Sequence, residues 1–136
     1  MKVIRKAGLL LVRDGCILLC RKSRGTQMLI LPGGKYEGAE TGVACLAREV
    51  REELGPELDL VNPEFVGSYS DAAAGEADRI VEIDLYRSEL SGEPAACSEI
   101  AELVWFRPDG DLALLSPSLR NKILPDLFAR GLLQKE

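Results

Sequence analysis

Three glutamates near the middle of the chain, Glu49, Glu52 and Glu53, have a spacing that brings their side chains together on one helix. The segment 41–54 has the apolar period of a helix, and at about 100° per residue the three carboxylates fall within an arc of about 100°. Like charges at these spacings repel one another by about a few tenths of a kcal/mol per pair, so a purely structural helix gains nothing from them. Hard divalent cations prefer carboxylate oxygen, and the cluster therefore predicts a site for Mg²⁺, with Mn²⁺ as the alternative.

A solvated acidic face neutralised by Arg48 and Arg51 is the other interpretation of the same residues, and the surrounding spacing decides against it. Gly34 is followed after five residues by Glu40, and after seven more by Arg48-Glu49. After two further residues come Glu52-Glu53, and after one more comes Gly55. This pattern resembles the Nudix box, the signature of the Nudix hydrolase family, at all seven of its fixed positions. Chance would produce such a match in on the order of one chain in a million of this length.

The resemblance implies a fold and a reaction. The implied fold is α/β, or α+β, of the α/β/α sandwich type, in which a mixed sheet lies between helices and residues 1–136 form one domain. The implied reaction is hydrolysis of a nucleoside diphosphate linked to another group, with a divalent cation bridging protein carboxylates and phosphate oxygens. The chain departs from the family at Pro56, where an aliphatic residue is usual, and this affects the path of that loop.

Roles follow from the matching positions. Glu49 or Glu52 would orient or deprotonate the attacking water, and the box alone does not choose between them. Arg48 would hold Glu40 or Glu49 by an ion pair, and Glu40 would support the site or act as base. The implied metal ligands are three carboxylates and one backbone carbonyl: Glu49, Glu52, Glu53 and Gly34.

Residues outside the box supply further candidates. Glu102, with Glu99 as second choice, is a candidate metal ligand or else a charge at a strand edge. Asn121 could read the edge of a purine or cap the start of a helix. Four basic residues could bind phosphate or remain solvated: Lys35, Arg21, Lys22 and Arg24.

We expect a MutT-like pyrophosphohydrolase that converts a nucleoside triphosphate, an oxidised deoxynucleotide being one candidate, to a nucleoside monophosphate and pyrophosphate. Hydrolysis of ADP-ribose, another nucleotide sugar or a dinucleoside polyphosphate is the alternative. A nucleotide sensor without catalysis is disfavoured, because such a protein should have lost one of the metal glutamates, and all three are present.

Composition excludes several other classes. The 136 residues carry a net charge of −5 and no basic stretch long enough to follow a nucleic-acid backbone. The chain has no histidine, which excludes Ser/His/Asp and Cys/His catalysis. Apolar runs such as 8–12 fall far short of the roughly 20 residues that span a bilayer, and no leader is evident, so we expect a cytoplasmic protein. A homodimer is expected only because small sheet proteins of this kind often pair.

The elements that must position these residues can be predicted from apolar periodicity and turn signals. Segments 7–12 and 16–20, joined by Arg13-Asp14-Gly15, predict a hairpin. The helix 41–54 should bury a stripe of Val43, Ala47, Val50 and Leu54. A second helix is expected over 118–133, kinked or delayed by Pro125. Further strands are expected at 28–31, 58–61, 64–70, 79–90 and 102–106, with loops at 71–78 and 91–98.

Overall fold

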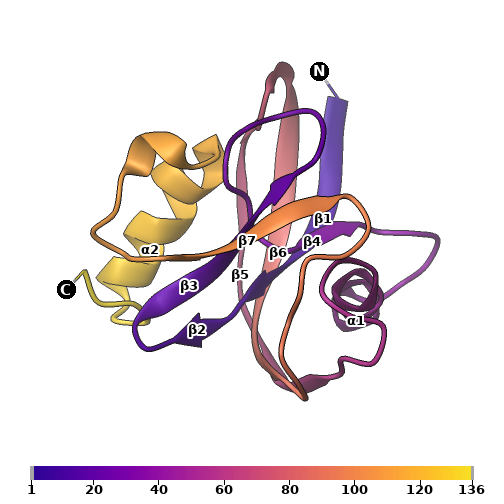
Figure 1. The fold of residues 1–136 in the computed structure, drawn as a ribbon. Coiled ribbons are helices and arrows are strands. Elements are labelled where there is room, and N and C mark those ends of the chain that lie inside the picture. The colour runs from indigo at the N-terminus through magenta and orange to yellow at the C-terminus, as the bar shows by residue number, and fades with distance from the viewer. Residues whose placement is uncertain (1, 136) are drawn as a thin grey trace.

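The computed structural model describes residues 2–135, which form two β-sheets with helices on both sides (Figure 1). The four-stranded sheet has the order β4 (Gly33–Lys35), β1 (Lys2–Leu10), β6 (Glu76–Leu90) and β5 (Leu60–Ala73). The three-stranded sheet has the order β2 (Val12–Arg13), β3 (Cys16–Lys22) and β7 (Ile100–Phe106). Parallel pairing of β1 with β6, beside antiparallel neighbours, makes the larger sheet mixed. The predicted fold class is confirmed, with the strands divided between two sheets.

The helices α1 (Gly42–Glu53) and α2 (Leu124–Ala129) lie on opposite sides of the strands (Figure 1). Each covers its own apolar core. Leu9 of β1 is buried in the core under α1, whereas the next residue, Leu10, is buried in the core under α2. Because both faces of β1 are covered, its apolar run is nearly continuous and does not alternate with polar residues. Every helix within residues 2–135 is too short or too polar to cross a bilayer.

The predicted hairpin is correct at its turn and too long in its first strand. Asp14 and Gly15 both have positive φ, 51° and 79°, as a two-residue hairpin turn requires. Only Val12 and Arg13 pair with β3 in this hairpin. The residues before Leu11 belong to the other sheet, so the apolar run that looked like one strand passes from one sheet to the next.

Other predicted boundaries change because of long-range pairing. The predicted loop 71–78 is mostly strand, since β5 and β6 pair as far as Ala73 and Glu76. The predicted strands 58–61 and 64–70 are one strand with irregular register. Segment 28–31 makes only isolated bridges, at Leu29 and Ile30, and the edge strand is β4 instead.

The helix α1 forms where it was predicted but is rotated about its axis relative to the predicted stripe. The Thr41 hydroxyl caps its start by accepting from the N–H of Ala44. Val43, predicted to be core, is 39% exposed, whereas Leu46 is fully buried. The buried residues of the helix itself are Cys45, Leu46, Val50 and Glu53.

The predicted C-terminal helix is two elements. A π-helical segment, η2 (Leu119–Ile123), precedes α2, and Pro125 lies in the first turn of α2. Proline has no N–H to donate, so a regular helix cannot run through this position with its hydrogen bonds intact. The change from π-helix to α-helix just before Pro125 agrees with the expected kink, and Asn121 lies inside η2 instead of at a helix start.

The rotation of α1 can be tested by truncating one residue from each stripe. Leu46→Ala should lower the free energy of unfolding by about 2–5 kcal/mol, because it removes a fully buried side chain. Val43→Ala should change it by about 0.5 kcal/mol or less, as expected for a surface position. Urea unfolding followed by circular dichroism measures both. Equal costs at the two positions would contradict the observed orientation of the helix.

Candidate active site

Arg48 is the centre of an ion-pair network that includes Glu40 and Glu49. Its Nε and Nη2 donate to the Glu40 carboxylate at 2.8 and 3.0 Å, and its Nη1 donates to Glu49 Oε2 at 2.6 Å. Nη2 also donates to the carbonyl of Lys35 at 2.9 Å, which ties α1 to β4. The hydrogen bond from Arg48, with that from the N–H of Glu37, lowers the pKa of Glu40 to about 2. Arg48 thus pairs with both glutamates that the box offered as partners.

The three box glutamates have different environments. The side chain of Glu52 is 53% exposed, whereas that of Glu49 is 14% exposed. Glu53 is buried, and its Oε1 accepts from the N–H of Gly33 at 2.9 Å. Burial raises the pKa of Glu53 to about 7, and the charge of Glu49 adds to the shift. Burial also raises the pKa of Glu49, against the effect of Arg48. Only Glu52 is therefore largely exposed, whereas Glu49 and Glu53 are largely removed from solvent.

Two glycines on β4 make this burial possible. A Cβ on Gly34 would lie 2.2 Å from Glu49 Oε1, and one on Gly33 would lie 2.1 Å from the carbonyl oxygen of Ala7. Gly33 also has a φ of +140°, which side-chain-bearing residues rarely adopt. The Gly34 carbonyl, a predicted metal ligand, accepts from the Cys45 thiol at 3.5 Å. Cys45 is fully buried and packs in the core beneath α1.

The carboxylates suit a hard cation by their chemistry. Among the described residues no group of three is already gathered as a metal site, because Glu49 faces Arg48 and Glu53 faces the N–H of Gly33. Both carboxylates have raised pKa values, which shows that their negative charge is incompletely compensated. A divalent cation would compensate it, so Glu49 and Glu53 fit a metal-binding role, with Glu52 at the exposed edge.

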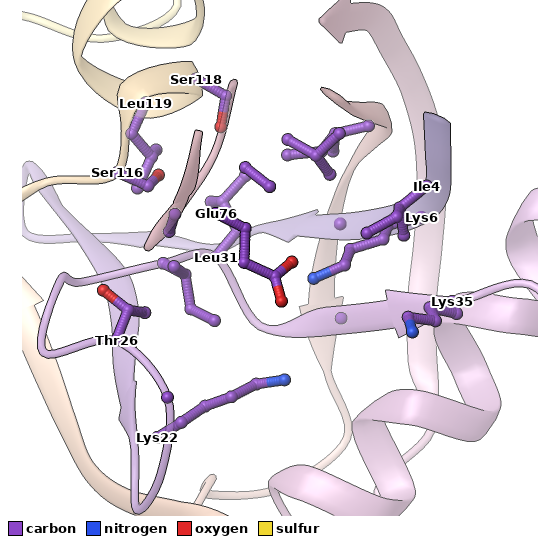
Figure 2. A pocket seen from close by; sticks show the side chains of 18 of the residues that line it. Ile4, Lys6, Lys22, Thr26, Leu31, Lys35, Glu76, Ser116, Ser118 and Leu119 are labelled. Atoms are coloured by element: carbon purple, nitrogen blue, oxygen red, sulfur yellow. The ribbon is translucent and has the colours of Figure 1, made fainter. Parts of the chain in front are cut away.

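A cavity of about 270 Å³ lies beside β4, and several basic residues line it (Figure 2). Gly33, whose N–H holds Glu53, is part of its wall. Lys6 of β1, Lys22 of β3 and Lys35 of β4 all line it. Burial lowers the pKa of Lys6, and repulsion from Lys22 adds to the effect. Three strands therefore direct positive charge into one cavity beside the acidic helix.

Some predicted binding residues line the cavity and others do not. Lys35, Lys22 and Arg24 line it. Arg21 instead forms an ion pair with Glu102 between β3 and β7 and donates to the carbonyl of Gln27. Glu102, the predicted extra metal ligand, is therefore ion-paired with Arg21 within the smaller sheet.

The remaining two predictions outside the box also fall away from the cavity wall. Asn121 is exposed, and its Nδ2 donates to Asp71 at 3.1 Å. Glu99 contributes its backbone carbonyl to the N–H of Ser23. Neither residue belongs to the described lining of the cavity. Ser116 and Ser118, which precede η2, line the cavity there instead.

Sequence reasoning missed six polar residues of the cavity wall, which are Lys6, Thr26, Glu76, Arg79, Ser116 and Ser118. The alternation of β1 offered one signal, because Ile4, Lys6 and Gly8 share a strand face and Lys6 is polar in an otherwise apolar surrounding. Glu76 was assigned to a loop, and Arg79 to the start of a strand without a role in the site. Their position over the cavity depends on the long β5–β6 hairpin, which the sequence did not reveal.

The comparisons with known proteins agree with the fold and the box. The chain matches the family described as NUDIX domain over residues 3–127. It is 31% identical over 112 residues to a CTP pyrophosphohydrolase of Escherichia coli K12, covering 80% of this chain and 79% of that protein. It is 31% identical over 138 residues to the nucleoside triphosphatase NudI of Salmonella schwarzengrund, covering 91% and 94%. The crystal structure of a MutT NUDIX hydrolase from Burkholderia pseudomallei superimposes with a TM-score of 0.76 at 25% identity, covering 93% and 98%.

The chain therefore belongs to the Nudix hydrolase family. It is a hydrolase of the class that acts on phosphoric anhydrides, and its relatives act on nucleotide substrates. Enzymes of this family generally require divalent metal ions.

A substitution that keeps the positive charge tests whether Arg48 acts by positioning several partners at once. Arg48→Lys keeps the charge but cannot reach Glu40, Glu49 and the Lys35 carbonyl together, because an ammonium lacks the planar fork of a guanidinium. We expect nucleotide hydrolysis to fall at least about tenfold. Arg51→Lys is the matched control on the same helix, where the arginine pairs with exposed Asp59. Similar losses in both variants would contradict a positioning role for Arg48.

The burial of Glu53 predicts how its replacement changes stability with pH. The folded-state pKa of about 7 lies above the unfolded value of roughly 4.3. Ionisation therefore costs stability progressively as the pH rises from about 4 to 7. Glu53→Gln should stabilise the metal-free protein at pH 8 relative to the parent, by about 3 kcal/mol more than at pH 4. Urea unfolding in chelator at both pH values measures this, and an effect independent of pH would contradict it.

Proposed function

We propose that this protein is a Mg²⁺-dependent nucleoside triphosphate pyrophosphohydrolase that releases a nucleoside monophosphate and pyrophosphate. The observation that carries the proposal is the contact between the acidic helix and the cationic cavity through a single residue, Gly33. Its N–H holds the Glu53 carboxylate, and it also forms part of the cavity wall. A substrate in this cavity would have its phosphates beside the box glutamates. The names of the two relatives at 31% identity support the triphosphate class.

The lysines explain how an acidic protein would attract a polyphosphate. The chain has a net charge of −5, so its overall field repels nucleotides. Lys22 and Lys6 lie close enough to Glu53 to oppose its raised pKa, which places positive charge at the acidic end of the cavity. Lys22 and Lys35 would neutralise phosphate oxygens there and hold the chain of phosphates against α1.

The reaction requires water to attack a phosphorus and an anhydride P–O bond to break, with the electron pair leaving on the departing phosphate. Glu49, Glu53 and Glu52 would hold Mg²⁺, or Mn²⁺ in its place, and the cation would polarise the phosphorus and lower the pKa of water. Glu52 is the most exposed of the three and has only a long contact of 3.3 Å to Arg48 Nη1, so it would accept the proton of the attacking water. Arg48 would keep Glu49 directed at its ligand position, and Glu40 would keep Arg48 in place.

Glu52→Gln tests the site directly. The substitution preserves size and removes a proton-accepting, metal-facing charge, so turnover should fall by about a hundredfold or more while the fold is unchanged. The assay measures pyrophosphate, orthophosphate and monophosphate from CTP, UTP, ATP, GTP, their deoxy forms and 8-oxo-dGTP at saturating Mg²⁺. ADP-ribose and diadenosine polyphosphates belong in the same panel.

The control for this substitution is Glu57→Gln, which removes an exposed charge beyond the end of α1. Full activity of Glu52→Gln would overturn the proposed site. Turnover of ADP-ribose or diadenosine polyphosphates without turnover of any triphosphate would overturn the proposed substrate class.

A further inference from the structure

The outer strand of the smaller sheet, β7, has an edge unlike the other sheet edges within residues 2–135. Strand order places β4 and β5 at the edges of the larger sheet and β2 and β7 at the edges of the smaller one. β2 has only two residues, and β4 has three and is held against α1. β5 contains Pro63 and register shifts, and Arg130 donates to the carbonyl of Val66 in that strand. Short length, proline and irregular register are usual means of preventing a sheet edge from pairing.

β7 has none of these features over its seven residues (Figure 1). It contains no proline, and its register against β3 is continuous from Glu102 to Phe106. Its single charged side chain, that of Glu102, forms an ion pair with Arg21 of the neighbouring strand. A regular edge of this length with little free charge is suited to pair with another strand.

The hydrogen bonds of β3 show which of its backbone groups face β7. The N–H groups of Leu18 and Cys20 donate to the carbonyls of Leu11 and Ile30, which lie on the other side of β3. Bonding direction alternates along an antiparallel strand, so the intervening Leu19 bonds to β7.

The register then assigns the backbone groups of β7. Val104 and Glu102 lie opposite Leu19 and Arg21, so their N–H and C=O groups bond to β3. The alternate residues direct their N–H and C=O groups to the open side of the strand, and they are Ala101, Leu103 and Trp105. Within the described part of the chain, β3 is the only strand paired with β7, and these three residues have no other backbone hydrogen bond. The edge therefore presents a row of free donors and acceptors.

This edge is complementary to a second copy of itself. When two β7 strands meet antiparallel with Leu103 on a two-fold axis, Leu103 lies opposite its equivalent and Ala101 lies opposite Trp105. These pairs join outward-facing groups, so each pair can exchange two hydrogen bonds. The smallest side chain of the strand then faces the largest, and Glu102 lies opposite Val104, so no like charges are directly opposed. A two-fold arrangement, in which both copies use the same surface, is the commonest in homo-oligomers.

The tryptophan of this edge is already held in position. Trp105 is 39% exposed, and the Arg13 guanidinium lies 5.5 Å from the centroid of its ring. Arg13 Nη1 is fixed in turn by both carboxylate oxygens of Glu93, at 3.0 and 2.9 Å. A side chain that is ordered before association loses less conformational entropy when it is buried, and tryptophan is enriched in protein interfaces. Trp105 therefore suits a contact with a second copy.

We propose that this protein forms a homodimer by antiparallel pairing of β7 with β7 of a second copy. The pairing joins the two three-stranded sheets into one continuous sheet. Leu103 lies at the two-fold axis, and Trp105 of each copy packs beside Ala101 of the other. No residue of the glutamate-bearing box belongs to β7, so this surface is separate from the acidic helix.

Sedimentation equilibrium over a concentration series measures the association. The parent should approach twice the chain mass of 14.8 kDa as the concentration rises. Ala101→Pro removes an outward N–H from each copy without removing a bond to β3, and it should weaken the dimer by about tenfold or more. Ala101→Thr is the matched control, because it changes the same exposed side chain and keeps the N–H. It should associate like the parent.

Hydrogen exchange tests the same pairing without any substitution. The amides of Ala101, Leu103 and Trp105 should exchange slowly at high protein concentration and rapidly after dilution. Those of Glu102 and Val104, which bond to β3, should be protected at both concentrations. Trp105 is the only tryptophan in the chain, so its fluorescence reports burial of this edge directly. Its emission should move to shorter wavelength on association.

Three results would contradict the dimer. The first is a parent that keeps the monomer mass at every concentration. The second is a folded Ala101→Pro variant that associates as tightly as the parent, since the contact would then involve another surface. The third is exchange of the three outward amides at a rate independent of concentration. If circular dichroism shows that Ala101→Pro is unfolded, the exchange pattern of the parent decides.

Discussion

The arrangement of this molecule depends on the burial of helix carboxylates against the two glycines of β4, Gly33 and Gly34. Charge burial is costly unless each carboxylate has partners, and here the partners are few. Arg48 serves Glu49, and one backbone N–H serves Glu53. Gly33 and Gly34 are required because a Cβ at either position would collide with a carboxylate or with neighbouring backbone. The glycines and the glutamates are therefore one structural unit, although they are about 15 to 20 residues apart in the chain.

This constraint also explains why α1 is rotated. An amphipathic helix optimised for packing alone would bury Val43 and leave acidic residues in water. Here Val43 is exposed, and Glu53 takes a place on the buried side. Packing comes instead from Leu46 and Val50, which are fully buried. The buried Glu53 carboxylate, whose pKa is raised, would be stabilised by positive charge at the acidic end of the cavity. Residues that violate local preferences in this way are expected at functional sites.

Features that depend on neighbouring residues could be predicted from the sequence, whereas features that depend on pairing between distant segments could not. The turn at Asp14-Gly15 and the cap at Thr41 are local, and both could be predicted from neighbouring residues. The box fixed the partners of Arg48, because Glu40 and Glu49 are part of the same pattern. The π-helix before Pro125 was anticipated only as a kink. Division of the strands into two sheets could not be predicted, since the run through Leu11 has no internal signal for the change of sheet.

The cavity shows where local patterns stop being informative. Its lysines come from β1, β3 and β4, and no pairwise spacing relates them. Their convergence follows from strand order and register, in which β4 pairs with β1 beside Gly33 and Gly34. Asn121 illustrates the same limit, because the break into η2 and α2 leaves it on the surface beside Asp71, while Ser118 faces inward.

Once formed, the cavity has positive charge at the end near α1 and uncharged hydroxyls at the other. Under the proposed function, a polyphosphate would gain attraction at the end near α1, so its phosphates would lie beside the box glutamates. Binding of the phosphates would therefore depend on one end of the cavity, and a change at the opposite end would leave the acidic helix undisturbed.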